Sequence, residues 1–228
     1  MTVTLLEPTT VVEPPDISQI VTEDDTPVDD LFSAKQQRLL VEPLYSSWHY
    51  EGTFLADANV GVFSAVHRPP IVPDMFLSLD VEVAENWWAK EHRSYFLWEF
   101  GKPPDVVVEI VSNHKGHETV EKLQEYARVG VRYYVIYDPQ TLLQETPLRV
   151  YELNVRGYHL RDDQQLAEVG LVLTLWAGVF EGKQTEWLRW CTLDGTLIPT
   201  GAERAEQERT RAERLAAQLR ALGIEPEV

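Results

Sequence analysis

The sequence predicts an α/β fold with a mixed β-sheet, followed by one extra helix at the C-terminus. Residues 105–138 follow a strand, helix and strand pattern, and a crossover unit of this kind favours parallel pairing. Hairpin signals follow in residues 148–161 and at Asp194 and Gly195, and hairpins pair their strands antiparallel. The two kinds of pairing together predict a mixed sheet.

The elements before the crossover unit are one helix and several strands. Residues 33–43 predict a short helix, with Ser33 as its N-cap and Pro43 at its end. Residues 54–63 have strand character at both ends, with an Asn-Val-Gly turn between them. Residues 72–81 alternate apolar and polar side chains, which is typical of a strand.

An aromatic segment, residues 84–99, separates these strands from the crossover unit. Its pattern predicts a helix that carries Trp87, Trp88 and Trp98. We expect these tryptophans in the core or in a dimer contact, because basic residues do not interleave with them as in a base-stacking surface.

The crossover unit begins with a hydrophobic strand at residues 104–112. A helix is predicted from His117, and Gly130 is placed to end it, because glycine is the usual residue just past a helix C-terminus. A second strand follows at residues 131–139, and residues 169–182 are apolar enough to form a later strand and turn.

Charge and composition divide the chain into three parts, with a formal net charge of −17 overall. Residues 1–30 hold eight Asp or Glu, four Pro and no Lys or Arg, so we expect a flexible acidic segment. Residues 31–200 hold 23 acidic and 15 basic residues and form the predicted domain. Residues 201–228 are rich in Ala, Glu and Arg, which predicts an exposed helix, either solvated or with a weak coiled-coil seam.

Several protein classes are excluded by the sequence. No apolar run approaches the roughly 20 residues needed to span a bilayer. The first residues lack the basic and apolar regions of a signal peptide. Cys191 is the single cysteine, so no intramolecular disulfide can form, and we expect a cytoplasmic protein. Neither a phosphate-binding glycine loop nor a Gly-x-Ser-x-Gly elbow is present.

The strand at residues 106–111 is apolar except for Glu109. Alternation along the strand places Glu109 on the same face as Val107 and Val111. An ionised carboxylate on a covered face costs several kcal/mol unless it is paired or binds a cation. Three explanations follow: Glu109 is solvated at a sheet edge, pairs with a basic side chain, or holds a metal ion with a second carboxylate.

Asp74 and Lys122 are the residues that could complete such a site. Asp74 follows Pro73, which suits the start of a strand, and it can converge with Glu109 if the two strands are neighbours. Two close carboxylates repel unless a cation lies between them, and Mg²⁺ suits such a pair. Lys122 lies beside the apolar face of the predicted helix, near Tyr126, and its long side chain can reach a neighbouring acidic site. Three explanations stay open: Lys122 is an ordinary solvated lysine, a structural ion-pair partner of Glu109, or a functional group of the site.

The chain resembles the Uma-two family of restriction endonucleases, a branch of the PD-(D/E)XK nuclease superfamily. The resemblance covers about residues 31–195 and rests on residues 72–74, residues 104–112, Lys122 with Tyr126, and residues 130–139. It implies a restriction-endonuclease-like fold, in which a mixed central β-sheet is flanked by helices. Residues 31–200 would form this domain, and residues 201–228 would add the C-terminal helix.

The resemblance also implies the site residues. Asp74 and Glu109 match the two acidic positions of the superfamily motif, and the backbone carbonyl of Ile110 matches a further metal ligand. The lysine of the motif would fall at Val111, which departs from the pattern, and Lys122 on the following helix takes its place.

A rival for the first carboxylate is Asp105, which shares the strand face of Glu109. We place it below Asp74, because a Pro-Asp pair at the start of the earlier strand fits the order of the motif better.

The function implied by the resemblance is hydrolysis of phosphodiester bonds by an endonuclease that uses Mg²⁺, or Mn²⁺, on double-stranded DNA. A homodimer would suit cleavage of both strands. Two alternatives stay open: a non-catalytic protein that keeps the nuclease fold to bind nucleic acid or protein, and an interaction protein that works through its C-terminal helix. The acidic domain weakens the nuclease interpretation, because proteins that bind nucleic acid usually carry a basic surface.

Overall fold

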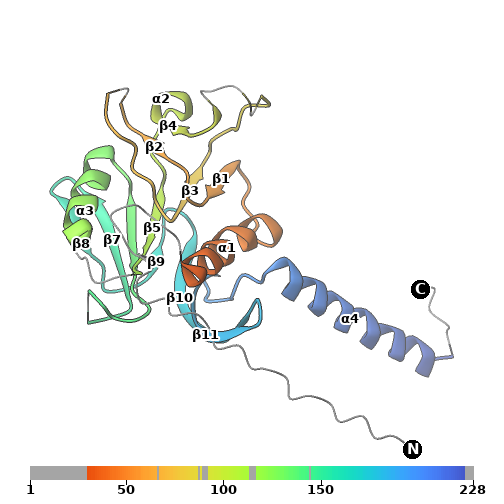
Figure 1. The fold of residues 1–228 in the computed structure, drawn as a ribbon. Helices are drawn as coiled ribbons and strands as arrows, with labels where there is room; N and C mark the ends of the chain where they lie inside the picture. Colours follow the sequence, from red (N-terminus) through yellow and green to blue (C-terminus); the bar gives the residue numbers. More distant parts are fainter. Residues whose placement is uncertain are drawn as a thin grey trace, which may run out of the picture.

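The computed structural model describes residues 30–65, 67–86, 88, 92–112, 117–143 and 145–223, apart from the side chains of residues 117–120. The predicted flexible segment, except for Asp30, lies outside these residues. In the described part, a mixed β-sheet is flanked by helices and by a second, smaller sheet, and one long helix projects from the body (Figure 1). The predicted α/β class is therefore confirmed.

Six strands form the central sheet in the order β1-β3-β5-β6-β7-β8. Their bounds are β1 Phe54–Asp57, β3 Met75–Leu79, β5 Val106–Ile110, β6 Tyr133–Tyr137, β7 Leu148–Asn154 and β8 Gly157–Leu160. Strands β5 and β6 are parallel, and the other neighbouring pairs are antiparallel. The predicted crossover unit and the predicted hairpin of β7 and β8 are therefore both present.

Helix α3, His117–Val129, connects the two parallel strands β5 and β6 across one face of the sheet (Figure 1). Gly130 follows it in a left-handed conformation with φ of 93°, and its N–H donates to the Tyr126 carbonyl at 3.0 Å. Glycine adopts this conformation at little steric cost. The predicted end of the helix at Gly130 is therefore confirmed.

The smaller sheet contains β9 Gln165–Leu166, β10 Leu171–Phe180 and β11 Lys183–Thr192, all paired antiparallel. The predicted turn at Asp194 and Gly195 follows β11, and its ends meet in a bridge between Cys191 and Leu197. Two further strands, β2 Val62–Phe63 and β4 Tyr95–Phe96, form a short parallel pair.

Helix α1, Leu31–Ser46, is longer than predicted at both ends. The prediction of Ser33 as N-cap was wrong, because the Asp30 carboxylate caps the helix and accepts the Ser33 N–H at 2.7 Å. The prediction that Pro43 ends the helix was also wrong. Pro43 lies inside α1, and Leu44 beyond it is completely buried, so packing outweighs the missing N–H donor.

The predicted helix at residues 84–99 was wrong. The described part of this segment contains β4, followed by one short helix, α2 Leu97–Phe100. Tyr95 is drawn into the fold by pairing with β2 and by a hydrogen bond of 2.8 Å with Ser78, so tertiary contacts override the local helical pattern. Trp88 is 82% exposed and Trp98 is 48% exposed, so the expected place in the core was wrong for both, while the alternative of a dimer contact stays a prediction. Trp87 is outside the described residues.

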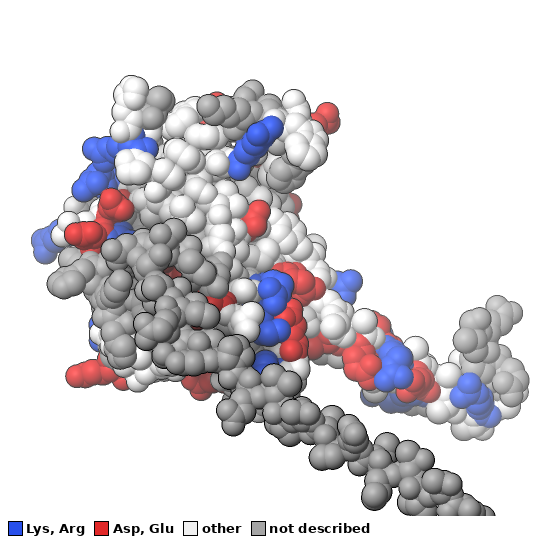
Figure 2. Space-filling model, viewed as in Figure 1, with Lys and Arg blue, Asp and Glu red and all other residues white. Residues whose placement is uncertain are grey.

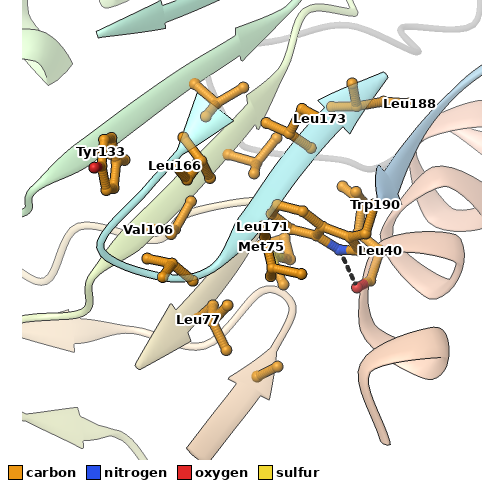
Figure 3. Packing of buried hydrophobic residues seen from close by; sticks show 14 of the residues in the cluster. Leu40, Met75, Leu77, Val106, Tyr133, Leu166, Leu171, Leu173, Leu188 and Trp190 are labelled. Carbon is orange, nitrogen blue, oxygen red and sulfur yellow. Dashed lines mark hydrogen bonds between the residues drawn. The ribbon is translucent and has the colours of Figure 1, made fainter. Parts of the chain in front are cut away.

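Two hydrophobic clusters cover the two faces of the central sheet. One cluster joins the sheet to α1 and the smaller sheet, with Trp190 donating to the Leu40 carbonyl at 2.8 Å (Figure 3). The second cluster lies under α3 and contains Val107, Tyr126 and Ile136. Glu109 shares the face of Val107, so its carboxylate belongs to the second cluster's side of the sheet.

Helix α4, Gly201–Ala221, confirms the predicted C-terminal helix, and none of its residues is buried. Thr200 and Glu203 form a capping box at its start, and both Glu203 oxygens also accept from Arg189, at 2.8 and 2.6 Å. Because Arg189 is only 1% exposed, this pair fixes the start of α4 to β11. No helix in the described residues is long and apolar enough to cross a membrane.

Candidate active site

Asp74 and Glu109 lie opposite each other at the ends of two neighbouring strands. Strands β3 and β5 are antiparallel, with Met75 paired to Val108. One step further along this register places Asp74 beside Glu109. Asp74 Oδ2 also accepts the Ile110 N–H at 2.6 Å, so the Asp74 side chain reaches across to the end of β5. The strand neighbourhood that the sequence interpretation required is therefore present.

Glu109 is 8% exposed, and both of its carboxylate oxygens accept hydrogen bonds from α3. Tyr126 donates to Oε1 at 2.7 Å, and Lys122 donates to Oε2 at 2.9 Å. These two donors are four residues apart, so they lie on the same side of the helix, one turn apart. Two donors, one of them charged, offset the cost of burying a carboxylate in a hydrophobic strand. Glu109 is therefore not solvated at a sheet edge, and the first of the three explanations for its place in the strand is excluded.

Tyr126 remains a hydrogen-bond donor over the whole physiological pH range. Its side chain is completely buried, and burial, followed by the charge of Glu109, raises the pKa of Tyr126 well above its usual value. A phenol that keeps its proton donates it to the carboxylate. Tyr126 therefore stabilises the ionised form of Glu109 and holds the side chain in one orientation.

Helix α1 contributes a residue that the sequence interpretation missed. Gln37 is 5% exposed, and its Nε2 donates to Asp74 Oδ1 at 3.3 Å. Its amide also exchanges hydrogen bonds with Asn59, which donates from Nδ2 to Gln37 Oε1 at 3.1 Å. Asn59 adopts a left-handed conformation with φ of 56°, and its N–H donates to the Pro73 carbonyl at 3.2 Å. Helix α1 buries two adjacent glutamines, Gln36 and Gln37, and no signal in the sequence alone indicates that Gln37 is the one that faces Asp74.

Asp105 is engaged elsewhere. Its Oδ2 accepts from the Leu79 N–H at 2.8 Å and from Lys102 Nζ at 2.6 Å. Four residues of extended chain, about 13 Å, separate it from Glu109 along the strand. These contacts give Asp105 a structural role at the start of β5, in keeping with its lower rank as a candidate ligand.

The donor atoms at the ends of β3 and β5 fit a hard divalent cation. In a strand, the N–H and C=O of one residue point to the same side, so the Ile110 carbonyl faces the side on which its N–H meets Asp74. The carboxylates of Asp74 and Glu109 add further oxygens with lone pairs beyond those used in hydrogen bonds. Groups of three or more His, Cys, Asp or Glu suited to a metal are absent from the described residues. An ion held by two carboxylates, one carbonyl and water is the mode that Mg²⁺ prefers.

The family model Uma2, described as "Putative restriction endonuclease", matches residues 23–179. The chain belongs to the Uma2 family. The resemblance drawn from the sequence is thus confirmed, and nuclease is the class of activity that the family's description assigns to its members.

One solved structure similar to the chain is titled "Crystal structure of a putative nuclease belonging to DUF820", from Anabaena variabilis ATCC 29413. The two chains are 16% identical, with a TM-score of 0.42, and the similarity covers 60% of this chain and 71% of the other. Similarity at this level supports no inference about substrate or mechanism. No curated protein matches the chain.

Within this Uma2 protein, the lysine that approaches the strand glutamate comes from α3. Lys122 contacts Glu109 directly, whereas Val111, at the motif position of the superfamily lysine, packs with the hydrophobic cluster under α3. The sequence expectation that the lysine lies on the helix thus agrees with the geometry.

Proposed function

We propose that this Uma2 protein is a metal-dependent endonuclease that hydrolyses phosphodiester bonds in double-stranded DNA. Asp74, Glu109 and Lys122 are the proposed catalytic residues, and the Ile110 carbonyl is the proposed additional metal ligand. The observation that supports this proposal is the convergence of Asp74 and Lys122 on Glu109 at one end of the central sheet. Family membership supports the nuclease class.

Each of the proposed residues has a task that follows from its contacts. Asp74 and Glu109 would hold Mg²⁺ or Mn²⁺, which when bound supplies a Lewis acid and a water of lowered pKa. Tyr126 and Gln37 keep the two carboxylates in place through the hydrogen bonds described above. Lys122, whose side chain is 31% exposed, presents a positive charge where negative charge develops on the phosphate, and it can orient the attacking water.

The structural alternative treats Lys122 and Glu109 as an ion pair with no catalytic role. Such a pair would already offset the burial of Glu109 and would need no second carboxylate. The placement of Asp74 opposite Glu109 favours the metal site over this alternative, because a second carboxylate in that position adds repulsion that a cation relieves.

Calorimetric titration of Mg²⁺ and Mn²⁺ separates the two explanations. The proposal predicts saturable binding to the wild-type chain and its loss in an Asp74→Asn/Glu109→Gln double variant that remains folded. The ion-pair alternative predicts equal heats for both proteins. An Asp105→Asn variant is the matched control, because it removes a strand carboxylate that lies outside the site and should bind metal like wild type.

The proposal includes a homodimer joined through α4. Leu215 and Leu219 are 49% and 36% exposed, and their spacing of four residues places them along one side of the helix. Leu222, just past the end of α4, is 75% exposed. Acidic and basic side chains alternate along α4 (Figure 2), so two copies can pair without strong repulsion. Light scattering should give a dimer for wild type and a monomer for Leu215→Ser/Leu219→Ser. A monomeric wild-type chain would remove the dimer from the proposal.

A further inference from the structure

A second basic residue lies on the same face of the sheet as Glu109. Strand β6 pairs Ile136 with Glu109 on one side and with Arg149 of β7 on the other. Side chains at paired positions of neighbouring strands point to the same face. Asp74, Glu109, Ile136 and Arg149 therefore form one row across β3, β5, β6 and β7.

The spacing of this row suits contact with a nucleic-acid strand. Neighbouring strands lie about 4.8 Å apart, so the backbone of Arg149 is about 10 Å from that of Glu109. About three nucleotide steps of one B-form strand or fewer cover this distance, because each step advances about 3.4 Å along the axis and further along the strand itself. Ile136 lies between them and is 2% exposed, so the row has an acidic end, an apolar centre and a basic end.

The guanidinium of Arg149 has no structural task in the described part of the chain. Nearby Arg161 pairs with Glu152 and Asp163, and Arg132 pairs with Glu152 and Glu168. For Arg149, by contrast, no ion pair or side-chain hydrogen bond occurs with any residue that the structure describes. Its side chain is partly buried. A partly buried guanidinium without an ion-pair partner is suited to bind an anionic group.

The distribution of charge makes such a residue important for a nuclease. Residues 31–200 hold eight more acidic than basic residues, so the domain as a whole repels a polyanion. On the face drawn in Figure 2, the Lys and Arg side chains of the described residues form separate groups rather than one continuous band. Binding of nucleic acid then depends on a few cations placed beside the acidic site.

We propose that Arg149 binds a backbone phosphate of the nucleic-acid strand that is cleaved, within about three nucleotides of the bond attacked at Asp74 and Glu109. This inference rests on the proposed function and deepens it, because it names the phosphate subsite next to the acidic pair. The planar guanidinium can donate two parallel hydrogen bonds to one phosphate, and it carries no base specificity.

The test measures binding of a fluorescein-labelled duplex of mixed sequence by fluorescence anisotropy, over a series of salt concentrations. Glu109→Gln serves as the parent so that the DNA stays intact, and Arg149→Gln is compared with Arg156→Gln. Arg156 is the matched control because it is an exposed arginine of the same hairpin, in the turn at the far end of β7. Both variants lose one positive charge.

We expect Arg149→Gln to bind about 10-fold more weakly than the parent, as for loss of one charged hydrogen-bonding contact. The slope of log K against log salt should become shallower by about 0.9, the contribution of one phosphate. Arg156→Gln should bind like the parent. Equal binding by Arg149→Gln and the parent, or equal weakening in both variants, would overturn the inference.

Cleavage by variants with an otherwise wild-type sequence distinguishes this inference from the proposed function. Arg149→Gln should raise KM with little change in kcat, and its Mg²⁺ titration should match wild type. Continued cleavage by Asp74→Asn/Glu109→Gln would refute the catalytic assignment and leave the Arg149 contact standing. Absence of DNA binding by the parent would overturn both.

Discussion

The hydroxyl of Tyr126 offers the sharpest test of how Glu109 is held. Tyr126→Phe removes one oxygen from a completely buried side chain and leaves Glu109 Oε1 without its donor at 2.7 Å. A hydrogen bond to a charged group contributes about 1.5–3 kcal/mol, and the ring itself is unchanged, so we expect destabilisation of about 2 kcal/mol. For a protein of this length, that corresponds to a fall of about 4–8 °C in Tm.

Tyr134→Phe is the matched control for this change. Tyr134 is 1% exposed and its ring lies 5.2 Å from that of Tyr126, centroid to centroid. Its hydroxyl makes no hydrogen bond to the residues that the structure describes, so its loss should change stability by less than about 0.5 kcal/mol. Urea denaturation of both variants measures the difference. Equal midpoints for Tyr126→Phe and Tyr134→Phe would refute the role assigned to the Tyr126 hydroxyl.

Three further changes follow from the same contacts. Lys122→Met should abolish cleavage but raise the affinity for Mg²⁺, measured by calorimetry, because it removes an ammonium that competes with the ion for Glu109. The Lys122 side chain is partly exposed, which limits the gain to about 1 kcal/mol, or about fivefold in affinity. Weaker Mg²⁺ binding by the variant would contradict this reasoning. Hydrogen bonds from Arg38 and Lys35 lower the pKa of Glu181 to about 2 from its usual 4.5, so these contacts stabilise the protein above about pH 4.5 and are lost as the pH falls toward 2. Acid titrations followed by circular dichroism should show this loss in wild type and not in Glu181→Gln, and identical curves would count against it. Glu203→Ala leaves the buried Arg189 without its carboxylate and should cost about 3 kcal/mol in urea denaturation, whereas the exposed Glu206→Ala should cost little.

The strands and helices of the crossover unit could be predicted from sequence because local pattern and tertiary contacts agree there. Strand β5 is apolar apart from Glu109 and buried on both faces, and α3 ends at a glycine that suits its left-handed conformation. The helix predicted for the aromatic segment before β5 was wrong for the opposite reason. Tyr95 is held by strand pairing and by a hydrogen bond to Ser78, which are contacts with distant residues that no local pattern encodes.

The residues of the candidate site that depend on the order of strands and helix could be proposed from the sequence. The residues that depend on packing between distant elements could not. Asp74, Glu109 and Lys122 could be proposed from the order of two strands and a helix. Gln37 and Arg149 could not, because their relation to the site arises only when α1 packs near Asp74 and β7 pairs with β6. The helix start at Asp30 was missed because Ser33 is an equally good capping residue by type, and only the backbone geometry decides between them.

Cleavage of a DNA duplex in the presence of Mg²⁺ tests the central claim most directly. The wild-type chain should convert the duplex to shorter fragments, and Asp74→Asn/Glu109→Gln should leave it intact while keeping the circular dichroism spectrum of the folded protein. Asp105→Asn should cut like wild type. Cleavage by the double variant at the wild-type rate would contradict the claim that these two carboxylates form the active site.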